Sequence, residues 1–192
     1  MRRRFAIARL IFGLGLCGLF VAPAGTAARQ SPAHVLVIDT PITPELRDAI
    51  LATDPADIRV VQLDSAGGSV KDAIAIGQWV RTNNIRTHVP EGAECASSCT
   101  IIFQAGVVRS AHPPARFLYH YASQKSTDAQ ERLMGRVLGT VLYVEALISF
   151  GAPESLYRMI PGDRDWRLSA DKARRYRIVQ VVATDDAGLS ED

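Results

Sequence analysis

The stretch Glu94-Cys95-Ala96-Ser97-Ser98-Cys99-Thr100-Ile101-Ile102-Phe103 decides how this chain is interpreted, because two adjacent serines stand where small residues give way to an apolar run. Such a boundary predicts a turn from a strand into a helix. A serine at this kind of turn suits hydrolysis, because the amide of the next residue points to the place where an oxyanion forms. Only small neighbours tolerate so tight a turn, and the residues flanking the serine pair are small. The stretch therefore predicts a serine nucleophile.

A glycine pair lies upstream, in Leu63-Asp64-Ser65-Ala66-Gly67-Gly68-Ser69-Val70, between an apolar strand and a helix start. Glycine lets a ligand approach the backbone, so this pair can offer a second amide to an oxyanion. A glycine pair after a strand is common in any α/β domain, and by itself it is weak evidence for an oxyanion loop.

Downstream, His120 stands at the end of an apolar strand in the run Phe117-Leu118-Tyr119-His120-Tyr121. A polar side chain at such a place requires an explanation, either a function or a hydrogen-bond partner. His120 is a candidate general base, although an isolated histidine at such a place is more often a hydrogen-bonded core residue. The other candidates are His34, His88 and His112. A carboxylate to orient the base could come from Asp163 or Asp165, and both also suit solvated loop positions.

Apolar runs and helical patterns alternate from residue 33 onward, which predicts one α/β domain with parallel strands. Strands are expected at 34–39, 58–63, 87–89, 107–108, 117–121 and 178–183, and helices at 43–53, 69–80, 100–105, 128–150, 153–160 and 169–174. The first strand is continuously apolar, as expected of a strand that is buried on both faces. The helix at 128–150 is apolar over more than one stripe, so it either lies deep in the domain or packs on another subunit.

The first 28 residues resemble a bacterial export signal. Arg2-Arg3-Arg4 is followed by thirteen residues, 10–22, without charge, and small residues crowd positions 22–28. This pattern predicts cleavage between residues 24 and 28 and a periplasmic or secreted protein. A retained N-terminal anchor is the alternative, and it is the only membrane association that we expect. Residues 29–183 then form the domain, and the acidic residues 184–192 form a loose tail.

Charge and cysteine content narrow the functional classes. Removal of residues 1–28 takes four arginines, so 22 Lys and Arg fall to 18 against 20 Asp and Glu, and the formal charge changes from +2 to −2. Nothing basic is left that argues for nucleic-acid binding. The two cysteines that stay, Cys95 and Cys99, form either a disulfide or a pair of small buried thiols. Two such ligands make a weak metal site, and we expect neither a metal nor another cofactor.

Four short motifs resemble, in their order, the Clp protease proteolytic subunit of the Clp/crotonase superfamily. They are Ser65-Ala66-Gly67-Gly68-Ser69-Val70, Cys95-Ala96-Ser97-Ser98-Cys99 with Gly106 nine residues after Ser97, Tyr119-His120, and Asp165-Trp166-Arg167-Leu168-Ser169-Ala170. The order Ser, His, Asp and its spacings of 23 and 45 residues are similar to those of the family. A group of exported, uncharacterised Clp-like proteins carries a similar Cys-Ala-Ser-x-Cys element. The resemblance covers roughly residues 33–183.

The resemblance implies a ββα superhelical α/β fold and a serine-type endopeptidase. By motif position, Ser97 matches the nucleophile, His120 the general base and Asp165 the orienting acid. The amides of Gly68, beside Gly67, and of Ser98 match the oxyanion hole. The resemblance also implies that the helix at 128–150 is a handle through which copies of the chain assemble.

The chain departs from the family pattern in three ways. Tyr121-Ala122-Ser123 replaces the family's Gln-Pro after the histidine, and Cys99 replaces a glycine. Export would also separate the protein from cytoplasmic ATP, so a partner ATPase is not expected. A self-contained peptidase for peptides or unfolded chains fits these departures best.

Two alternatives stay open. One is a Ser-Lys enzyme like a signal-peptide peptidase, for which the available lysines are Lys71, Lys125 and Lys172. The other is a non-catalytic scaffold or binding protein of the same fold, including a crotonase-type binder of acyl thioesters, because a fold does not fix a function.

Overall fold

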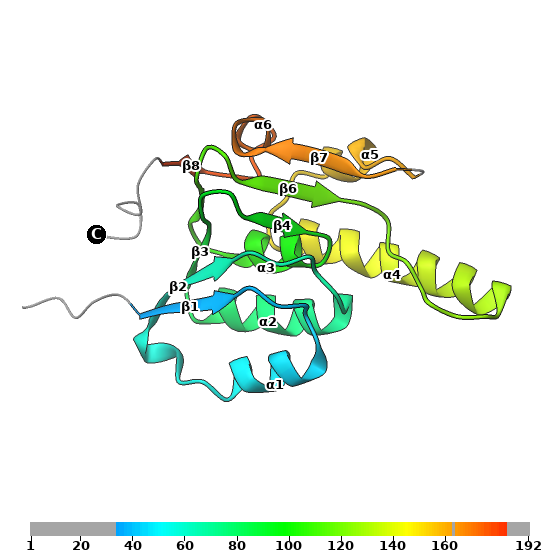
Figure 1. Ribbon diagram of the computed structural model, residues 1–192, viewed down its shortest axis with the longest axis horizontal. Coiled ribbons are helices and arrows are strands. Elements are labelled where there is room, and N and C mark those ends of the chain that lie inside the picture. Colours follow the sequence, from blue (N-terminus) through cyan, green and yellow to red (C-terminus); the bar gives the residue numbers. More distant parts are fainter. Residues whose placement is uncertain (1–33, 163, 184–192) are drawn as a thin grey trace, which may run out of the picture. The chain divides into compact units, whose positions relative to one another are not determined.

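Two sheets form the framework of the protein (Figure 1). The larger sheet has the order β1-β2-β3-β5-β8, with β1 (His34–Ile38), β2 (Ile58–Leu63), β3 (Arg86–Val89), β5 (Arg109–Ala111) and β8 (Val181–Val182). All its pairings are parallel. The smaller sheet has the order β4-β6-β7, with β4 (Glu94–Ala96), β6 (Arg116–Tyr119) and β7 (Trp166–Ser169). This computed structural model describes residues 34–162 and 164–183, and the predicted α/β class is confirmed.

The described helices are α1 (Pro44–Leu51), the short 3₁₀ helix η1 (Pro55–Asp57), α2 (Val70–Thr82), α3 (Cys99–Ala105), α4 (Ala129–Ser149), α5 (Ser155–Met159) and α6 (Ala170–Arg175). Most of them begin next to a residue whose side chain caps them, whereas α3 and α5 have no such cap. The side chains of Thr43, Ser69 and Asp128 accept hydrogen bonds from amides in the first turns of α1, α2 and α4. Each cap satisfies an amide that the helix itself leaves without a partner.

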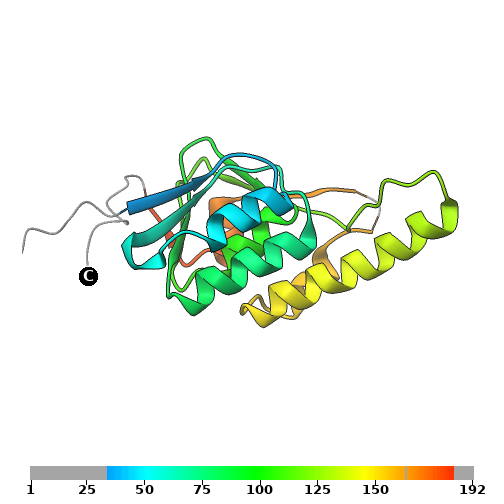
Figure 2. The ribbon, with the colours of Figure 1, turned by 90° about the horizontal axis from the view of Figure 1, so that it is seen from below.

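Helix α3 contacts strands of both sheets. Every residue of α3 is buried, and the rings of Phe103 and Phe117 lie 4.8 Å apart, which joins α3 to β6. On its other side α3 packs against α2, which in turn packs against α1 (Figure 2). Because the serine pair directly precedes α3, the turn that carries it is attached to a fully buried helix.

Three sequence-based expectations are wrong in detail. Strand β1 is not buried on both faces: Val35 and Val37, which share one face of the strand, are 39% and 53% exposed. Within the described residues β1 is an edge strand that pairs with β2. The strand expected at 107–108 begins two residues later, as β5. Strand β7 pairs antiparallel with β6, whereas the other pairings among the described strands are parallel.

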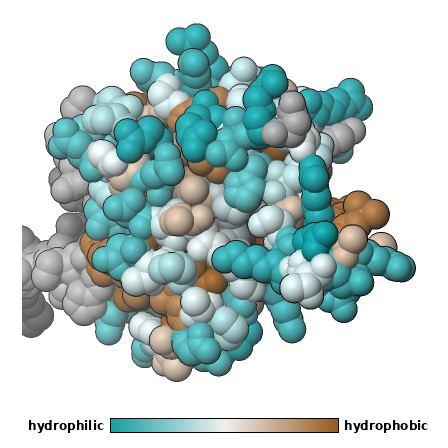
Figure 3. All heavy atoms as spheres, turned by 45° about the vertical axis from the view of Figure 1, so that its right-hand side comes forward, coloured by the Kyte–Doolittle hydropathy of each residue, from teal (hydrophilic) through white to brown (hydrophobic). Residues whose placement is uncertain are grey.

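Helix α4 has only three buried side chains, Tyr143, Ala146 and Leu147, all near its C-terminal end. Its N-terminal part extends past the sheets in both ribbon views (Figures 1 and 2). Six large apolar side chains there are about half exposed: Leu133, Met134, Val137, Leu138, Val141 and Leu142. Apolar surface also stands out on the face seen in Figure 3, which is otherwise largely hydrophilic. Deep burial of the whole helix is therefore excluded, and packing on another subunit stays a prediction.

The expected export signal, residues 1–28, and the expected acidic tail, residues 184–192, lie outside the described residues. Within the part of the chain that the structure describes, no helix combines the length and apolarity needed to cross a membrane.

Candidate active site

The smaller sheet brings Ser97 next to the end of β6. Strands β4 and β6 run parallel, with Ala96 opposite Leu118. Just beyond this pair, the Ser97 amide donates a 2.8 Å hydrogen bond to the Leu118 carbonyl. The serine turn thus starts two residues along the sheet from His120.

His120 and Asp165 lie at the corresponding ends of β6 and β7. These strands are antiparallel, and their last pair is Tyr119 opposite Trp166. Continuing that register by one residue sets His120 opposite Asp165. The rings of Tyr119 and Trp166 lie 5.7 Å apart on one face, so the alternation of side chains along strands turns His120 and Asp165 to the other face. Both residues line a single pocket.

The three residues adjoin the ends of neighbouring strands of the smaller sheet, but Ser97 does not line the pocket that His120 and Asp165 share, and the three side chains are not hydrogen-bonded to one another. Among the described residues, no hydrogen bond joins Ser97 to His120 or His120 to Asp165. His120 Nδ1 instead donates to the Tyr121 carbonyl at 2.7 Å, and Asp165 Oδ2 forms an ion pair with Arg167 Nη2 at 2.9 Å. Because a carbonyl can only accept, Nδ1 carries the proton, and Nε2 of the neutral ring keeps its lone pair. That tautomer is the one a general base needs.

Ser97 has a backbone conformation that is rare for residues other than glycine. Its φ is +53°, in the left-handed region, which costs on the order of 1–3 kcal/mol and occurs often at functional sites. The surrounding contacts hold it there: the Ser97 carbonyl accepts from the Thr100 amide at 2.9 Å and from Thr100 Oγ1 at 2.7 Å.

A tyrosine of α4 extends these hydrogen bonds. We call the linked groups of Ser97, Thr100 and Tyr143 the brace. Tyr143 Oη lies 2.7 Å from Thr100 Oγ1. Since the Thr100 hydroxyl proton goes to Ser97, Tyr143 is the donor. Burial raises the pKa of the Tyr143 phenol well above its usual value, so the phenol keeps its proton. A chain of buried hydrogen bonds therefore connects α4 to the backbone of Ser97.

The glycine pair lies directly against the serine turn. Gly67 has a φ of +88°, and a Cβ there would lie 2.6 Å from the Ala96 carbonyl oxygen and 2.8 Å from Ser97 Cβ. Only glycine fits this position. The amide of Gly68 donates a 2.7 Å hydrogen bond to Ser98 Oγ, and Ser98 is fully buried. One of the two amides proposed for an oxyanion hole is thus occupied by a neighbouring hydroxyl, a contact that the sequence does not predict.

A disulfide joins Cys95 to Cys99, with a Cα–Cα distance of 5.3 Å. It closes a ring around the serine pair, and both cysteines are fully buried. The residues on either side of the turn are therefore linked covalently as well as by packing. Among residues 34–162 and 164–183, no group of three His, Cys, Asp or Glu side chains is arranged to hold a metal ion.

No protein-family model matches the sequence, and no curated protein does. Among solved structures, the chain is similar to a ClpP1 mutant from Listeria monocytogenes, with a TM-score of 0.64 and 20% sequence identity over 81% of this chain and 94% of that one. At this identity the likeness concerns the fold alone. The expected Clp/crotonase-like α/β fold is confirmed.

Proposed function

We propose that the protein is a serine peptidase that hydrolyses peptides or unfolded protein with a Ser-His-Asp triad. The proposal is supported above all by the smaller sheet, in which three neighbouring strand ends carry Ser97, His120 and Asp165 in that order across the sheet. The Clp-like fold is a second, coarser support.

In this mechanism Ser97 Oγ attacks the peptide carbonyl carbon while His120 Nε2 takes the hydroxyl proton. The amides of Gly68 and Ser98 stabilise the oxyanion. His120 then passes the proton to the leaving amine, and a water molecule, activated by the same imidazole, releases the acyl group from Ser97. Asp165 orients the imidazole through Nδ1 and stabilises its charged form. No cofactor is needed for these steps.

Three local rearrangements would complete the site. Ser97 Oγ must first come within hydrogen-bond distance of His120 Nε2. His120 Nδ1 must exchange the Tyr121 carbonyl for Asp165, which in turn must release Arg167. The Gly68 amide must exchange Ser98 Oγ for the substrate oxygen. Asp165 and Arg167 are largely exposed, at 42% and 60% of their side chains, so their ion pair is weak and easily broken. Catalytic hydrogen bonds that form only with substrate bound are common in hydrolases.

We further infer that the peptidase works outside the cytoplasm, without an ATPase partner, as a homo-oligomer built through the exposed apolar residues of α4. The export pattern in residues 1–28 supports the location, and the half-exposed apolar side chains of α4 support the assembly.

A non-catalytic binding protein of the same fold is the second candidate. It is favoured by one observation: the Gly68 amide is already satisfied by Ser98 Oγ, so the oxyanion hole is closed in this structure. The Ser-Lys alternative has less support. Lys71, Lys125 and Lys172 are all exposed, and within the described residues no lysine amine is hydrogen-bonded to Ser97.

Hydrolysis of an unstructured, dye-labelled protein by the purified chain tests this proposal. Ser97→Ala and His120→Ala are expected to abolish turnover, whereas Ser149→Ala, an exposed serine at the end of α4, keeps the wild-type rate. Full activity of Ser97→Ala would refute the triad. Activity that survives His120→Ala but disappears on replacement of one lysine would favour the Ser-Lys enzyme, and no turnover by the wild type would favour the binding protein.

A further inference from the structure

A pocket with an excess of positive charge adjoins the proposed base. It has a volume of about 420 Å³ and is lined by His120 and Asp165 together with Arg132, Arg136 and Arg164. Among the described residues that line it, the one carboxylate is Asp165, which is already ion-paired with Arg167. Among the described lining residues, three arginines against one aspartate leave a formal excess of two positive charges.

We propose that this pocket binds a carboxylate of the substrate peptide, either an acidic side chain or a free C-terminus. The inference rests on the proposed peptidase function and specifies its substrates: peptides with a negative charge close to the bond that is cleaved.

Two of the arginines are held in position while keeping donors to spare. Arg136 Nη2 donates to the Gly162 carbonyl at 2.7 Å, and Arg132 Nη1 donates to the carbonyls of Ser126 and Thr127 at 2.7 and 2.8 Å. The other N–H groups of these two guanidinium ions have no hydrogen-bond partner within the described residues. A guanidinium has five donors in a fixed fork that matches a carboxylate, so both arginines can still take part in such a bond.

The wall of the pocket is closely packed against α4. A Cβ on Gly135 would lie 2.6 Å from Gln124 Cγ, and one on Gly139 would lie 2.8 Å from Ala122 Cβ. These glycines, one helical turn apart, let residues 122–124 lie directly on the helix. The Ala122 amide fixes the same segment by donating to Thr140 Oγ1 at 3.0 Å.

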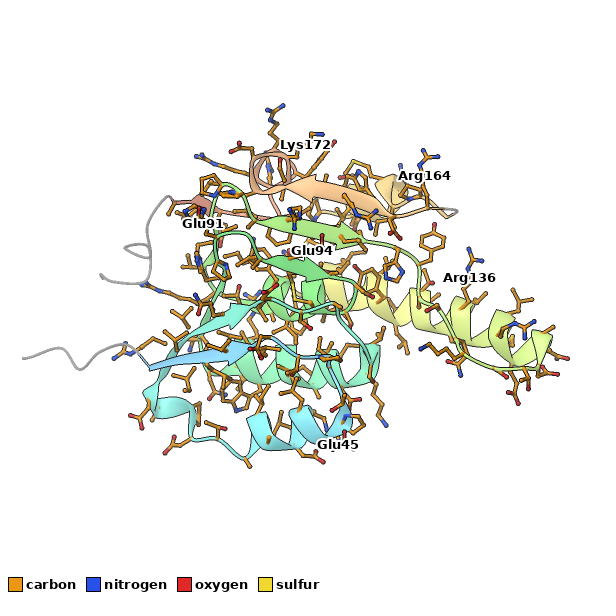
Figure 4. The ribbon with its side chains drawn as sticks, in the orientation of Figure 1. Glu45, Glu91, Glu94, Arg136, Arg164 and Lys172 are labelled. Carbon is orange, nitrogen blue, oxygen red and sulfur yellow. A yellow bond between two sulfur atoms is a disulfide. The ribbon has the colours of Figure 1, made fainter. Side chains whose placement is uncertain are left out.

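The opposite wall is joined to this segment. Gly162 lies close to the Tyr121 ring, where a Cβ would be 3.3 Å from Cε2, and its carbonyl accepts from Arg136. Figure 4 shows Arg136 extending from α4 on the side of the molecule that carries Arg164. The pocket is therefore bounded by three parts of the chain that contact one another, rather than by scattered surface arginines.

The remaining lining suits a peptide. Tyr121, Leu133 and Pro161 add apolar surface beside the arginines, which fits a side chain or chain end with an apolar stem and a charged tip. Because His120 lines the same pocket, a carboxylate bound by the arginines would hold the neighbouring peptide bond next to the proposed base.

Fluorescence anisotropy with the intact Ser97→Ala protein tests the pocket without any need for turnover. Three dye-labelled peptides of one neutral sequence are compared: one with an internal Glu, one with Gln in its place, both with amidated ends, and the Gln peptide with a free C-terminus. A charge-assisted hydrogen-bonded pair with the arginines can form only with a charged peptide, so we expect a carboxylate peptide to bind at least about tenfold more tightly than the neutral one.

Substitutions in the Ser97→Ala protein show whether the pocket arginines cause the difference in affinity between charged and neutral peptides. Arg136→Gln, or Arg132→Gln as a second variant, is expected to remove most of the difference between charged and neutral peptides. Arg59→Gln, an exposed arginine on β2, changes the net charge equally and should leave the difference intact. Preference for the Glu peptide identifies an acidic side chain, and preference for the free end identifies the C-terminus.

Equal affinity for all three peptides, or an equal effect of Arg136→Gln and Arg59→Gln, would overturn the proposal. Failure of the pocket proposal can be distinguished from failure of the proposed peptidase function. If the peptides bind selectively but the wild-type protein cleaves nothing, the carboxylate pocket is supported and the peptidase function is contradicted. If the wild-type protein cleaves peptides with no preference for carboxylates, the peptidase function is supported and the pocket is contradicted.

Discussion

At the scale of single residues, the decisive feature is the left-handed conformation of Ser97. Three features hold this conformation. The Cys95–Cys99 disulfide links the residues on either side of the serine pair, Thr100 donates hydrogen bonds to the Ser97 carbonyl, and Gly67 lies directly against Ser97. None of these contacts involves the Ser97 hydroxyl, which leaves that group for chemistry. The site therefore depends on contacts that fix the backbone of the nucleophile rather than its side chain.

Replacement of Gly67 by alanine should abolish activity. Any alanine at positive φ costs on the order of 1 kcal/mol, and at Gly67 the added Cβ also meets the Ala96 carbonyl and Ser97 Cβ below 3 Å, so the serine turn must move. Gly92→Ala is the matched control, because Gly92 has a φ of +73° and nothing within 4 Å of an added Cβ. We expect both variants to lose stability in urea and only Gly67→Ala to lose turnover. Equal activity of the two would show that the close approach of Gly67 is irrelevant.

Some residue contacts could not be predicted from the sequence. The Ser97–His120–Asp165 order could be proposed from the motifs, but the structure gives each polar group a different partner, such as the Tyr121 carbonyl for His120 and Ser98 Oγ for Gly68. These pairings depend on rotamers and on local backbone direction within a fraction of an ångström. A sequence pattern does not carry that information.

At the scale of secondary-structure elements, the brace between α4 and α3 connects the projecting helix to the serine turn. Thr100→Val keeps the shape of the side chain, removes the hydroxyl bond to Ser97 and leaves the buried Tyr143 phenol without an acceptor. An unsatisfied buried group costs about 1–3 kcal/mol. We expect Thr100→Val to lower kcat with little change in KM, and Thr100→Ser to restore it.

Thr87→Val is the control for this variant. Thr87 is equally buried, and its Oγ1 donates to the Phe103 carbonyl in the same helix, away from the serine turn, at 2.8 Å. It should cost similar stability without the specific fall in kcat. If Thr87→Val and Thr100→Val reduce kcat alike, the brace acts on the stability of α3 and not on the position of Ser97.

The elements differ in how far sequence could define them. Helices α1, α2 and α4 were predictable because capping side chains mark their starts. Strands β4 and β7 were not predicted, although they lead directly to Ser97 and Asp165. They are three and four residues long and contain charged residues, so they are strands only because of pairing with β6, which is distant in sequence.

At the scale of the whole molecule, the half-exposed apolar side chains of α4 predict self-association. A monomer would leave six of them in water, and such a patch is typical of an interface. Leu138→Glu should shift the protein toward the monomer in sedimentation velocity while leaving the melting temperature of the fold nearly unchanged. Val37→Glu places the same charge on an equally exposed apolar residue of β1 and should have no such effect. A wild-type protein that sediments as a monomer at all concentrations would contradict this prediction.

The central claim is that Ser97 is an activated nucleophile, and reaction with a fluorophosphonate followed by peptide mass mapping tests it most directly. The account predicts one adduct per chain, located on Ser97, and none on Ser97→Ala. An adduct on Ser98, or no adduct on the wild-type protein with its disulfide either intact or reduced, would contradict it.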